Sequence, residues 1–250
     1  SWHAALFPTG RSGMHKITVG DWRKAEAGPM QVVSGPIGRE TIHFEAPDAG
    51  RLPQEMKRFL EWFDSPFKGD LNLKAGIAHF WFVTIHPFED GNGRTARALA
   101  DMQLARAEGS SHRFYSMSAE IQRQHKSYYD ILEKTQKGGL DITPWLVWFL
   151  EVLEGAIDGA EVITGKVMTK ARFWAGNAEQ SFNVRQQKML NRLLDGFEGK
   201  LTSSKWAKIC KCSQDTATRD INDLIEKGTL EKEPGGGRST SYTLSAGSSS

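Results

Sequence analysis

The chain carries, at residues 86–97, the sequence His86-Pro87-Phe88-Glu89-Asp90-Gly91-Asn92-Gly93-Arg94-Thr95-Ala96-Arg97. The segments on both sides predict helices, because residues 71–85 are rich in apolar side chains and residues 94–107 repeat apolar side chains at helical spacing. Pro87 disfavours a helical backbone at the residue before it, so the first helix should end at His86. The stretch is therefore expected to be a loop between two helices of a mainly α fold.

The entry to the second helix has the properties of an anion site. The first backbone N–H groups of a helix have no acceptor within the helix, and they carry roughly half a positive charge. Gly91 and Gly93 let a phosphate approach the main chain without meeting a Cβ atom. Arg94 and Arg97 are three residues apart and so share one helix face. We expect both guanidinium groups to reach the same polyphosphate.

Two further side chains of the loop supply chemistry. Asp90 offers the hard oxygen ligands that Mg²⁺ prefers, and Mg²⁺ usually combines one or two carboxylates with substrate phosphates. His86 titrates near neutral pH without help, which makes it the natural acceptor of a hydroxyl proton. Taken singly, Asp-Gly and Asn-Gly pairs are common turn signals, and paired arginines usually form a solvated face. Their order between two helices favours a functional site.

The stretch resembles the signature of the Fic family, HPFxxGNGRxxR, and matches it at every fixed position. The resemblance implies a Fic-type helical bundle that transfers AMP from ATP to a Ser, Thr or Tyr hydroxyl of a protein, with the chain itself among the possible targets. His86 would be the general base, Phe88 would anchor the loop, and Asp90 would hold Mg²⁺. The implied nucleotide-binding residues of the motif are Gly91, Asn92, Gly93, Arg94, Thr95, Ala96 and Arg97.

The resemblance also bears on competing activities. Related Doc-type kinases carry Lys at the position of Gly93, so glycine there favours AMP transfer over phosphorylation. Many Fic proteins carry an inhibitory helix with Ser or Thr, three residues, Glu, then Gly or Asn, and this sequence contains no match. Removal of AMP, which depends on that glutamate, is therefore disfavoured. Because the chain begins with Ser1, we expect a processed or cut chain or a residual tag, with the control element upstream or in another protein.

Two segments outside the motif fit the same resemblance. Residues 38–47 alternate between Gly and Pro boundaries, as a β-hairpin strand does, and resemble the Fic flap that pairs with the target segment. The expected flap residues are Thr41, Ile42 and His43. Residues 128–138 resemble the helix that closes over the nucleotide base, which would make Tyr129 and Gln136 nucleotide neighbours. The alternatives are a plain surface hairpin and ordinary core aromatics.

The remaining sequence indicates the domain order. We expect an irregular N-terminal arm over residues 1–34, a Fic catalytic domain over 35–172, a linker over 173–184, a winged helix-turn-helix domain over 185–244 and a Ser-rich tail over 245–250. Thr143 is expected to cap a long apolar helix, with Pro144 at its first position.

The winged-helix assignment follows from a helix at 187–194, a second within 201–210 opened by Ser203 or Ser204, and a third at 213–227. Strands at 229–233 and 239–244 would form the wing. Gln214, Thr216, Thr218 and Arg219 lie on the expected recognition helix. Acidic and basic residues are nearly balanced over 201–250, so DNA binding competes with a protein-docking or dimerisation role.

Composition limits the remaining function classes. The formal net charge is +2, so no general attraction to nucleic acid or membrane is implied. No apolar run approaches the roughly 20 residues of a membrane span, and no signal peptide is evident, which favours a cytoplasmic protein. Cys210 and Cys212 are expected to be reduced structural thiols. A different class of function also remains open: a transcriptional regulator that senses a nucleotide without turning it over.

Overall fold

The computed structural model describes residues 2–36, 38–234 and 240–245, and the chain forms two compact units, residues 1–160 and 161–250. Helix α7, Thr143–Gly176, passes from the first unit into the second. The other elements of the first unit are α1 Trp2–Leu6, β1 Arg11–Ser12, β2 His15–Lys16, the 3₁₀ turn η1 Ala25–Ala27, β3 Gln31–Ser34, β4 Thr41–Glu45, η2 Ala49–Arg51, α2 Leu52–Asp64, α3 Leu71–Ile85, α4 Asn92–Glu108, α5 Met117–Arg123 and α6 His125–Gln136. Those of the second unit are α8 Val184–Leu194, α9 Ser203–Cys210, α10 Gln214–Glu226, β5 Leu230–Lys232 and β6 Tyr242–Leu244.

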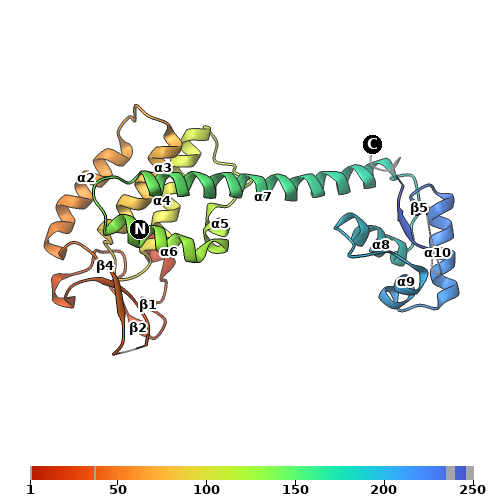
Figure 1. Ribbon diagram of the computed structural model, residues 1–250, viewed down its shortest axis with the longest axis horizontal. Coiled ribbons are helices and arrows are strands. Elements are labelled where there is room, and N and C mark those ends of the chain that lie inside the picture. Colours follow the sequence, from red (N-terminus) through yellow and green to blue (C-terminus); the bar gives the residue numbers. More distant parts are fainter. Residues whose placement is uncertain (1, 37, 235–239, 246–250) are drawn as a thin grey trace. The chain divides into compact units, whose positions relative to one another are not determined.

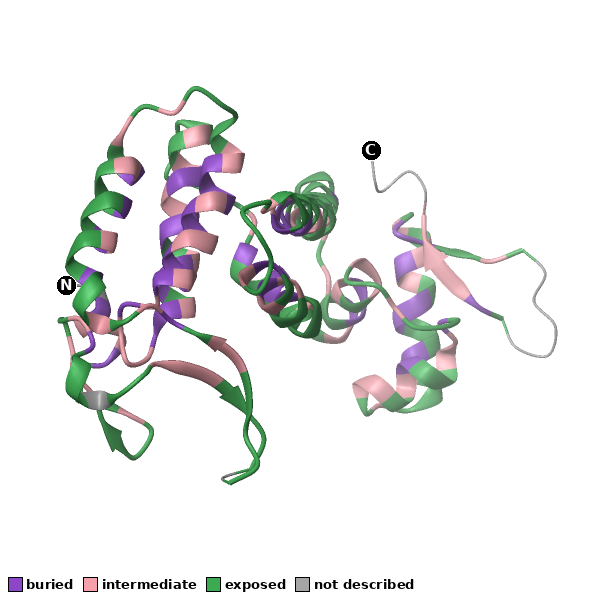
Figure 2. Cartoon of the chain, turned by 60° about the vertical axis from the view of Figure 1, so that its left-hand side comes forward, coloured by how far each residue is buried: buried purple, intermediate pink, exposed green. Residues whose placement is uncertain are grey.

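Helices α3 and α4 form the centre of the first unit and lie side by side (Figure 1). The buried residues of α2 and α3 lie on the inner faces of these helices (Figure 2), and Phe59, Trp145 and Phe149 are fully buried in this core. The indole Nε1 of Trp145 donates to the carbonyl oxygen of Gly76, 2.8 Å away. A Cβ atom on Gly76 would lie 3.1 Å from the Phe149 ring, so glycine allows α3 to approach α7 this closely.

The two helices around the motif end and begin where their residues permit. Helix α3 has the predicted bounds, because its N-cap Asp70 accepts a hydrogen bond from the Asn72 N–H and the chain turns left-handed at His86. Helix α4 begins at Asn92, two residues before the predicted start. Gly91 adopts a left-handed conformation with φ 83° as its N-cap, and this lets the helix begin directly after it.

The prediction of an irregular arm over residues 1–34 is wrong. This segment contains α1, the antiparallel pair β1–β2 and the strand β3, which pairs with β4. His3 and Phe7 are buried, and the His3 ring stacks on Phe88 at a centroid distance of 4.0 Å. Elements of two to five residues are too short to produce a hydrophobic period, so the sequence pattern did not indicate them.

Helix α7 differs from expectation at both ends. It begins at Thr143, one residue before the predicted first position, and the Asp141 carboxylate accepts the hydrogen bond from the Thr143 N–H, so Thr143 is not the cap. At its other end the helix continues through Gly176, and Phe173, the first residue of the expected linker, is buried in the core of the second unit. The expected domain boundaries at 172 and 184 stay predictions.

The second unit contains the predicted three helices and a two-stranded antiparallel sheet. Asn183 opens α8 through a capping box with Gln186, and Ser213 caps α10 as predicted. Helix α9 begins at Ser203, one of the two predicted openings, and its cap is Thr202. Trp206 and Ile221 are fully buried between the helices. Residues 235–239 and 246–250 lie outside the described residues. They include most of the expected wing loop at 234–238, the start of the expected second wing strand at Ser239 and most of the Ser-rich tail.

Two smaller expectations can be compared directly. Cys210 and Cys212 are free thiols, in agreement with the sequence analysis. Within the described ranges, no helix has the length and apolar character that crossing a bilayer requires.

Candidate functional site

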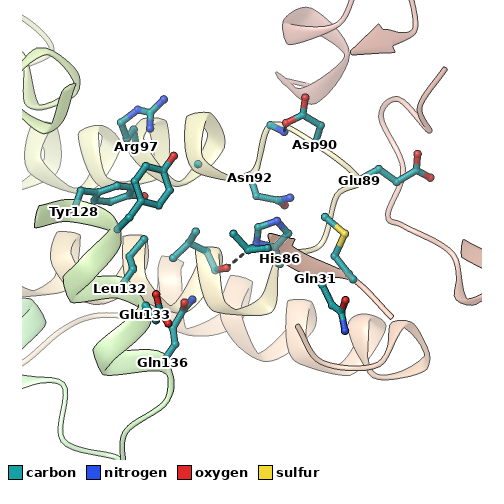
Figure 3. Close-up of a pocket in the computed structure, with 16 residues that line it drawn as sticks. Gln31, His86, Glu89, Asp90, Asn92, Arg97, Tyr128, Leu132, Glu133 and Gln136 are labelled. Atoms are coloured by element: carbon teal, nitrogen blue, oxygen red, sulfur yellow. Dashed lines mark hydrogen bonds between the residues drawn. The ribbon is translucent and has the colours of Figure 1, made fainter. Parts of the chain in front are cut away.

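A cavity of about 270 Å³ opens at the junction between α3 and α4. One wall comes from the motif loop and the first turn of α4, which follow each other in the sequence. The other walls come from one face of α6 and the start of β3, which are far from the motif in the sequence (Figure 3). The lining residues are Met30, Gln31, Val32, Val83, His86, Glu89, Asp90, Gly91, Asn92, Gly93, Arg97, Tyr128, Tyr129, Leu132, Glu133 and Gln136. The cavity therefore brings together most of the residues that the sequence analysis singled out.

His86 is held in one orientation at the end of α3. Its backbone is left-handed, with φ 51° and ψ 57°, and its N–H donates to the carbonyl oxygen of Phe82. The ring atom Nδ1 lies 3.1 Å from the carbonyl oxygen of Val83. A carbonyl can only accept, so Nδ1 carries the proton and Nε2 keeps its lone pair. Burial lowers the pKa of His86, which keeps the imidazole neutral and able to accept a proton at neutral pH.

Arg23 fixes the motif loop, and the sequence analysis missed it. Its side chain is buried, its Nε donates to the carbonyl oxygen of His86 at 2.8 Å, and its Nη2 donates to the carbonyl oxygen of Pro47. Its backbone N–H donates to the carbonyl oxygen of Pro87 at 2.9 Å. One guanidinium therefore ties the loop to the segment that follows β4. Every residue has a backbone carbonyl group, so the residue types of its partners could not indicate the role of Arg23 from the sequence.

Asn92 holds the loop in shape from within. Its Nδ2 donates to the carbonyl oxygen of Phe88 at 2.8 Å, and its Oδ1 accepts from the Phe88 N–H at 2.9 Å. The side chain is 2% exposed. Because Oδ1 and one N–H of Nδ2 are engaged within the loop, the amide holds the loop, and the backbone N–H and the second N–H of Nδ2 are left for the predicted phosphate cradle.

The first turn of α4 presents backbone donors to the cavity. The first backbone hydrogen bond of α4 runs from the Thr95 N–H to the carbonyl oxygen of Gly91. The N–H groups of Asn92, Gly93 and Arg94 therefore have no acceptor within the helix. A Cβ atom on Gly91 would lie 2.8 Å from the Phe7 ring. One on Gly93 would lie 3.6 Å from Nη1 of Arg97. Glycine at position 91 thus makes room for the Phe7 ring, whereas a Cβ atom at position 93 would make only an ordinary van der Waals contact.

Asp90 is positioned by the N-terminal segment. Its Oδ1 accepts from the Gly91 N–H at 2.5 Å, its Oδ2 accepts from the Ser12 hydroxyl, and its carbonyl oxygen lies 2.9 Å from Nε2 of His3. The described residues contain no group of three or more His, Cys, Asp or Glu side chains that could hold a metal ion alone. A single carboxylate beside a phosphate site fits Mg²⁺, which takes its other ligands from phosphates and water.

The two motif arginines have different surroundings. Arg97 lines the cavity, whereas Arg94 stacks over the Phe7 ring at 4.5 Å and lies 3.8 Å from Asp90 Oδ2, outside the lining. In this structure the Phe7 ring holds the Arg94 guanidinium, and the expectation that both guanidiniums reach the same polyphosphate stays a prediction. Thr95 and Ala96 are buried in α4, where the Thr95 hydroxyl donates to the Gly91 carbonyl oxygen.

Helix α6 supplies both predicted base neighbours. Tyr129 and Gln136 line the cavity, and Nε2 of Gln136 donates to the Thr84 hydroxyl at 3.2 Å. Glu133, between them on the helix, also faces the cavity, and helical spacing from Tyr129 could have indicated it. Tyr128 lies beneath, with its hydroxyl 3.0 Å from Nε2 of the fully buried His79. Burial lowers the pKa of His79 to about 3, and Arg97 adds to this effect.

The predicted flap is a real hairpin, formed by β3 and β4. Thr41 and Ile42 are exposed on β4, and the Ile42 side chain remains 49% accessible. His43, predicted with them, turns instead toward Glu133 of α6.

Comparison with known proteins agrees with this geometry. Residues 1–104 match the sequence model of the Fic/DOC family, and residues 185–243 match that of the DeoR-like helix-turn-helix domain. The chain carries a Fic/DOC domain followed by a DeoR-like helix-turn-helix domain. The predicted fold class and family resemblance are thereby confirmed.

The Fic/DOC domain has named relatives. A protein adenylyltransferase Fic of Drosophila willistoni is 34% identical over 114 residues, which is 45% of this chain and 21% of that protein. One of Drosophila grimshawi is 30% identical over 147 residues, covering 58% of this chain and 28% of that protein. The chain thus spans less than a third of the length of these relatives. Among solved structures, a Fic family protein from Desulfovibrio desulfuricans G20 is 21% identical with a TM-score of 0.48, covering 98% of this chain and 66% of that one.

Proposed function

We propose that this chain is a protein adenylyltransferase that transfers AMP from ATP to a Ser, Thr or Tyr hydroxyl of a protein, with its own hydroxyls among the possible acceptors. The observation that carries the proposal is the cavity that His86 shares with the first turn of α4. His86, a base with a free lone pair, and the backbone N–H donors for phosphate therefore face the same cavity. The relatives named protein adenylyltransferase support the same chemistry.

In the proposed reaction, the acceptor hydroxyl attacks the α-phosphorus of ATP. Nε2 of His86 takes the hydroxyl proton as the new oxygen–phosphorus bond forms, and the bond to the bridging oxygen of the β-phosphate breaks, releasing pyrophosphate. The N–H groups at the start of α4 and the guanidinium of Arg97 hold the phosphates and their developing charge. Tyr129 and Gln136 are the proposed neighbours of the adenine base.

Asp90 is the proposed ligand of Mg²⁺, together with phosphate oxygens of the nucleotide. When bound, the ion would neutralise part of the phosphate charge. The hydrogen bonds from Gly91 and Ser12 orient the carboxylate, and hydrogen-bonded carboxylates of this kind are typical of metal ligands.

Intact-mass measurement after incubation with each nucleoside triphosphate tests the proposal, because the added mass identifies both the donor and the transferred group. AMP transfer adds one AMP unit to the acceptor only with ATP. Addition of a phosphoryl group, or labelling that persists in His86→Ala, would overturn the assigned reaction or the assigned base.

A second candidate function concerns the helix-turn-helix unit, which we propose binds DNA. The observation in its favour is the set of exposed basic and amide side chains on α9 and α10, because two acidic residues of α10 are engaged in ion pairs within the unit. Asp220 is buried and accepts from the Arg185 guanidinium at 2.7 Å, and Asp223 accepts from Lys227 and Gln186. Each ion pair cancels one acidic and one basic charge, so the net charge of the unit stays nearly balanced, and the position of the remaining basic side chains is what favours DNA.

The exposed side of the same unit has a different composition. Lys205, Lys208 and Lys211 are exposed along α9 and its C-terminal turn, and Gln214, Thr218 and Arg219 are exposed on α10. Lysines supply phosphate contacts, while Gln and Arg can read base edges in the major groove. Selection from random duplexes followed by a salt titration tests this function. A bound sequence that Lys208→Ala weakens uniformly supports it, and the absence of any selected sequence contradicts it.

A further inference from the structure

The flap hairpin contains a β-bulge at His43. The register passes from Val32 opposite Phe44 to Val33 opposite Ile42, so His43 has no partner across the hairpin. An extra residue in one strand bends that strand and redirects its side chain, and bulges of this kind occur beside active sites. Here the imidazole of His43 lies between Ser34 of the hairpin and Glu133 of α6.

Both nitrogens of the His43 ring are engaged. Nε2 lies 2.6 Å from the Ser34 hydroxyl on β3, and Nδ1 lies 2.6 Å from Oε2 of Glu133 on α6. The other oxygen of Glu133 accepts from Nζ of Lys137 at 2.5 Å. The side chains of His43 and Glu133 are only about one third exposed, at 32% and 33%, so solvent screens this contact less than it screens a surface ion pair.

The contact connects two walls of the cavity. Glu133 lies on the α6 wall with Tyr129, whereas Gln31 and Val32 form the wall contributed by β3. The hairpin has a second anchor near its base, where Arg23 holds the carbonyl oxygen of Pro47 and the motif loop. The hairpin is thus attached to the motif loop at one point and to the nucleotide-facing helix at another.

We propose that His43 and Glu133 form a strap that fastens the flap hairpin to α6, so that nucleotide binding against α6 orders the strand on which the acceptor segment docks. The inference rests on the proposed function and makes the two side chains positioning residues for the acceptor. Coupling of this kind is reciprocal, so a segment docked on the hairpin also raises the affinity of the cavity for the nucleotide. The chain would then hold ATP most firmly when an acceptor is present.

Hydrogen exchange of the full chain, with and without ATP and Mg²⁺, tests the strap. His43→Ala is the main variant because His43 does not line the cavity. We expect amide exchange over residues 31–45 to rise about tenfold, the effect of losing one charge-assisted hydrogen bond. Glu133→Ala should give the same rise, and the double variant no further rise, since both changes remove one contact. Glu133→Gln, which still accepts from Nδ1–H, should restore much of the protection.

The matched control is Glu45→Ala. Glu45 lies on the same strand and accepts from Gln31 within the hairpin at 2.8 Å, without reaching α6. This variant should leave intact the effect of ATP on the hairpin. In the native chain ATP should slow exchange over both 86–97 and 31–45, and in His43→Ala only over 86–97.

The outcomes separate the strap from the proposed function. Native exchange rates over 31–45 in His43→Ala, or additive effects of the single variants, would overturn the strap even where 86–97 is protected by ATP. Lack of protection over 86–97 in the native chain would count against nucleotide binding and the proposed function. The nucleotide-free comparison of the variants would still decide whether the strap exists.

Discussion

Nδ1 of His86 lies 3.1 Å from the carbonyl oxygen of Val83, one turn earlier in the same helix. The contact is possible because His86 leaves α3 with a left-handed backbone, which folds its ring back over the last turn. The ring is thereby restricted to the tautomer with its free lone pair on Nε2. Local backbone geometry orients the imidazole of the proposed base, while the Arg23 side chain holds the carbonyl oxygen of His86.

Replacing the imidazole should abolish catalysis while leaving the nucleotide site intact. His86→Ala removes a positioned base, which contributes about 10² to 10⁴ in rate, so AMP transfer should fall by that factor with little change in ATP affinity. Transfer rates from labelled ATP and ATP dissociation constants measure the two effects. His112→Ala, a change at an exposed histidine outside the cavity, is the control and should behave as the native chain. An equal loss in both variants would contradict the assignment.

The buried His79 should make stability depend on pH. Its pKa falls from 6.5 to about 3 on folding because burial disfavours the charged form. Between these values the unfolded chain binds a proton that the folded chain does not, so the free energy of unfolding should decrease as the pH falls from 6.5 toward 3. The expected slope for one group is about 1.4 kcal/mol per pH unit.

Denaturant unfolding at a series of pH values compares the native chain with His79→Gln. Glutamine can still bond to the Tyr128 hydroxyl but does not titrate, so the pH slope of the variant should be shallower by the contribution of one proton. Other titrating groups are common to both chains and cancel in the difference. Parallel slopes would show that His79 titrates normally in the folded state.

The sequence predicts the parts of the fold that depend on neighbouring residues. The end of α3 follows from Pro87 after His86, the start of α10 follows from Ser213 as its cap, and the resemblance indicated Tyr129 and Gln136, which line the cavity. Helix caps, proline effects and glycine conformations are set by a few adjacent residues, which is why they can be read without coordinates.

The contacts that hold the site together could not be predicted in this way. Arg23 binds carbonyl oxygens 24 and 63 residues away, and the Ser12 hydroxyl binds Asp90 from 78 residues away. Such contacts depend on how short, irregular elements return to the motif loop. The bulge at His43 is similar, because a side-chain pattern of period two cannot reveal one extra residue in a strand.

Removing the amide of Asn92 should destabilise the motif loop. Asn92→Ala leaves the N–H and carbonyl groups of the partly buried Phe88 without their partners, and unpaired buried groups cost about 1–3 kcal/mol each. We expect the free energy of unfolding to fall by about 2 kcal/mol or more. Asn92→Asp keeps the acceptor for the Phe88 N–H and should lose less. The exposed Asn222→Ala is the control, and an equally small change in all three variants would contradict this role.

The two motif arginines should differ in their importance for nucleotide binding. Arg97 lines the cavity, whereas Arg94 is engaged with the Phe7 ring and Asp90 at its margin. Arg97→Gln removes a charge-assisted contact to phosphate worth about 1.5–3 kcal/mol, so the dissociation constant for ATP should rise at least about tenfold. Arg94→Gln should raise it less, and should instead lower thermal stability because the guanidinium loses its stacking on Phe7. Isothermal titration with ATP and Mg²⁺ and thermal unfolding of both variants measure these effects. A loss of affinity as large in Arg94→Gln as in Arg97→Gln would mean that Arg94 leaves Phe7 and joins Arg97 on the phosphates when ATP binds.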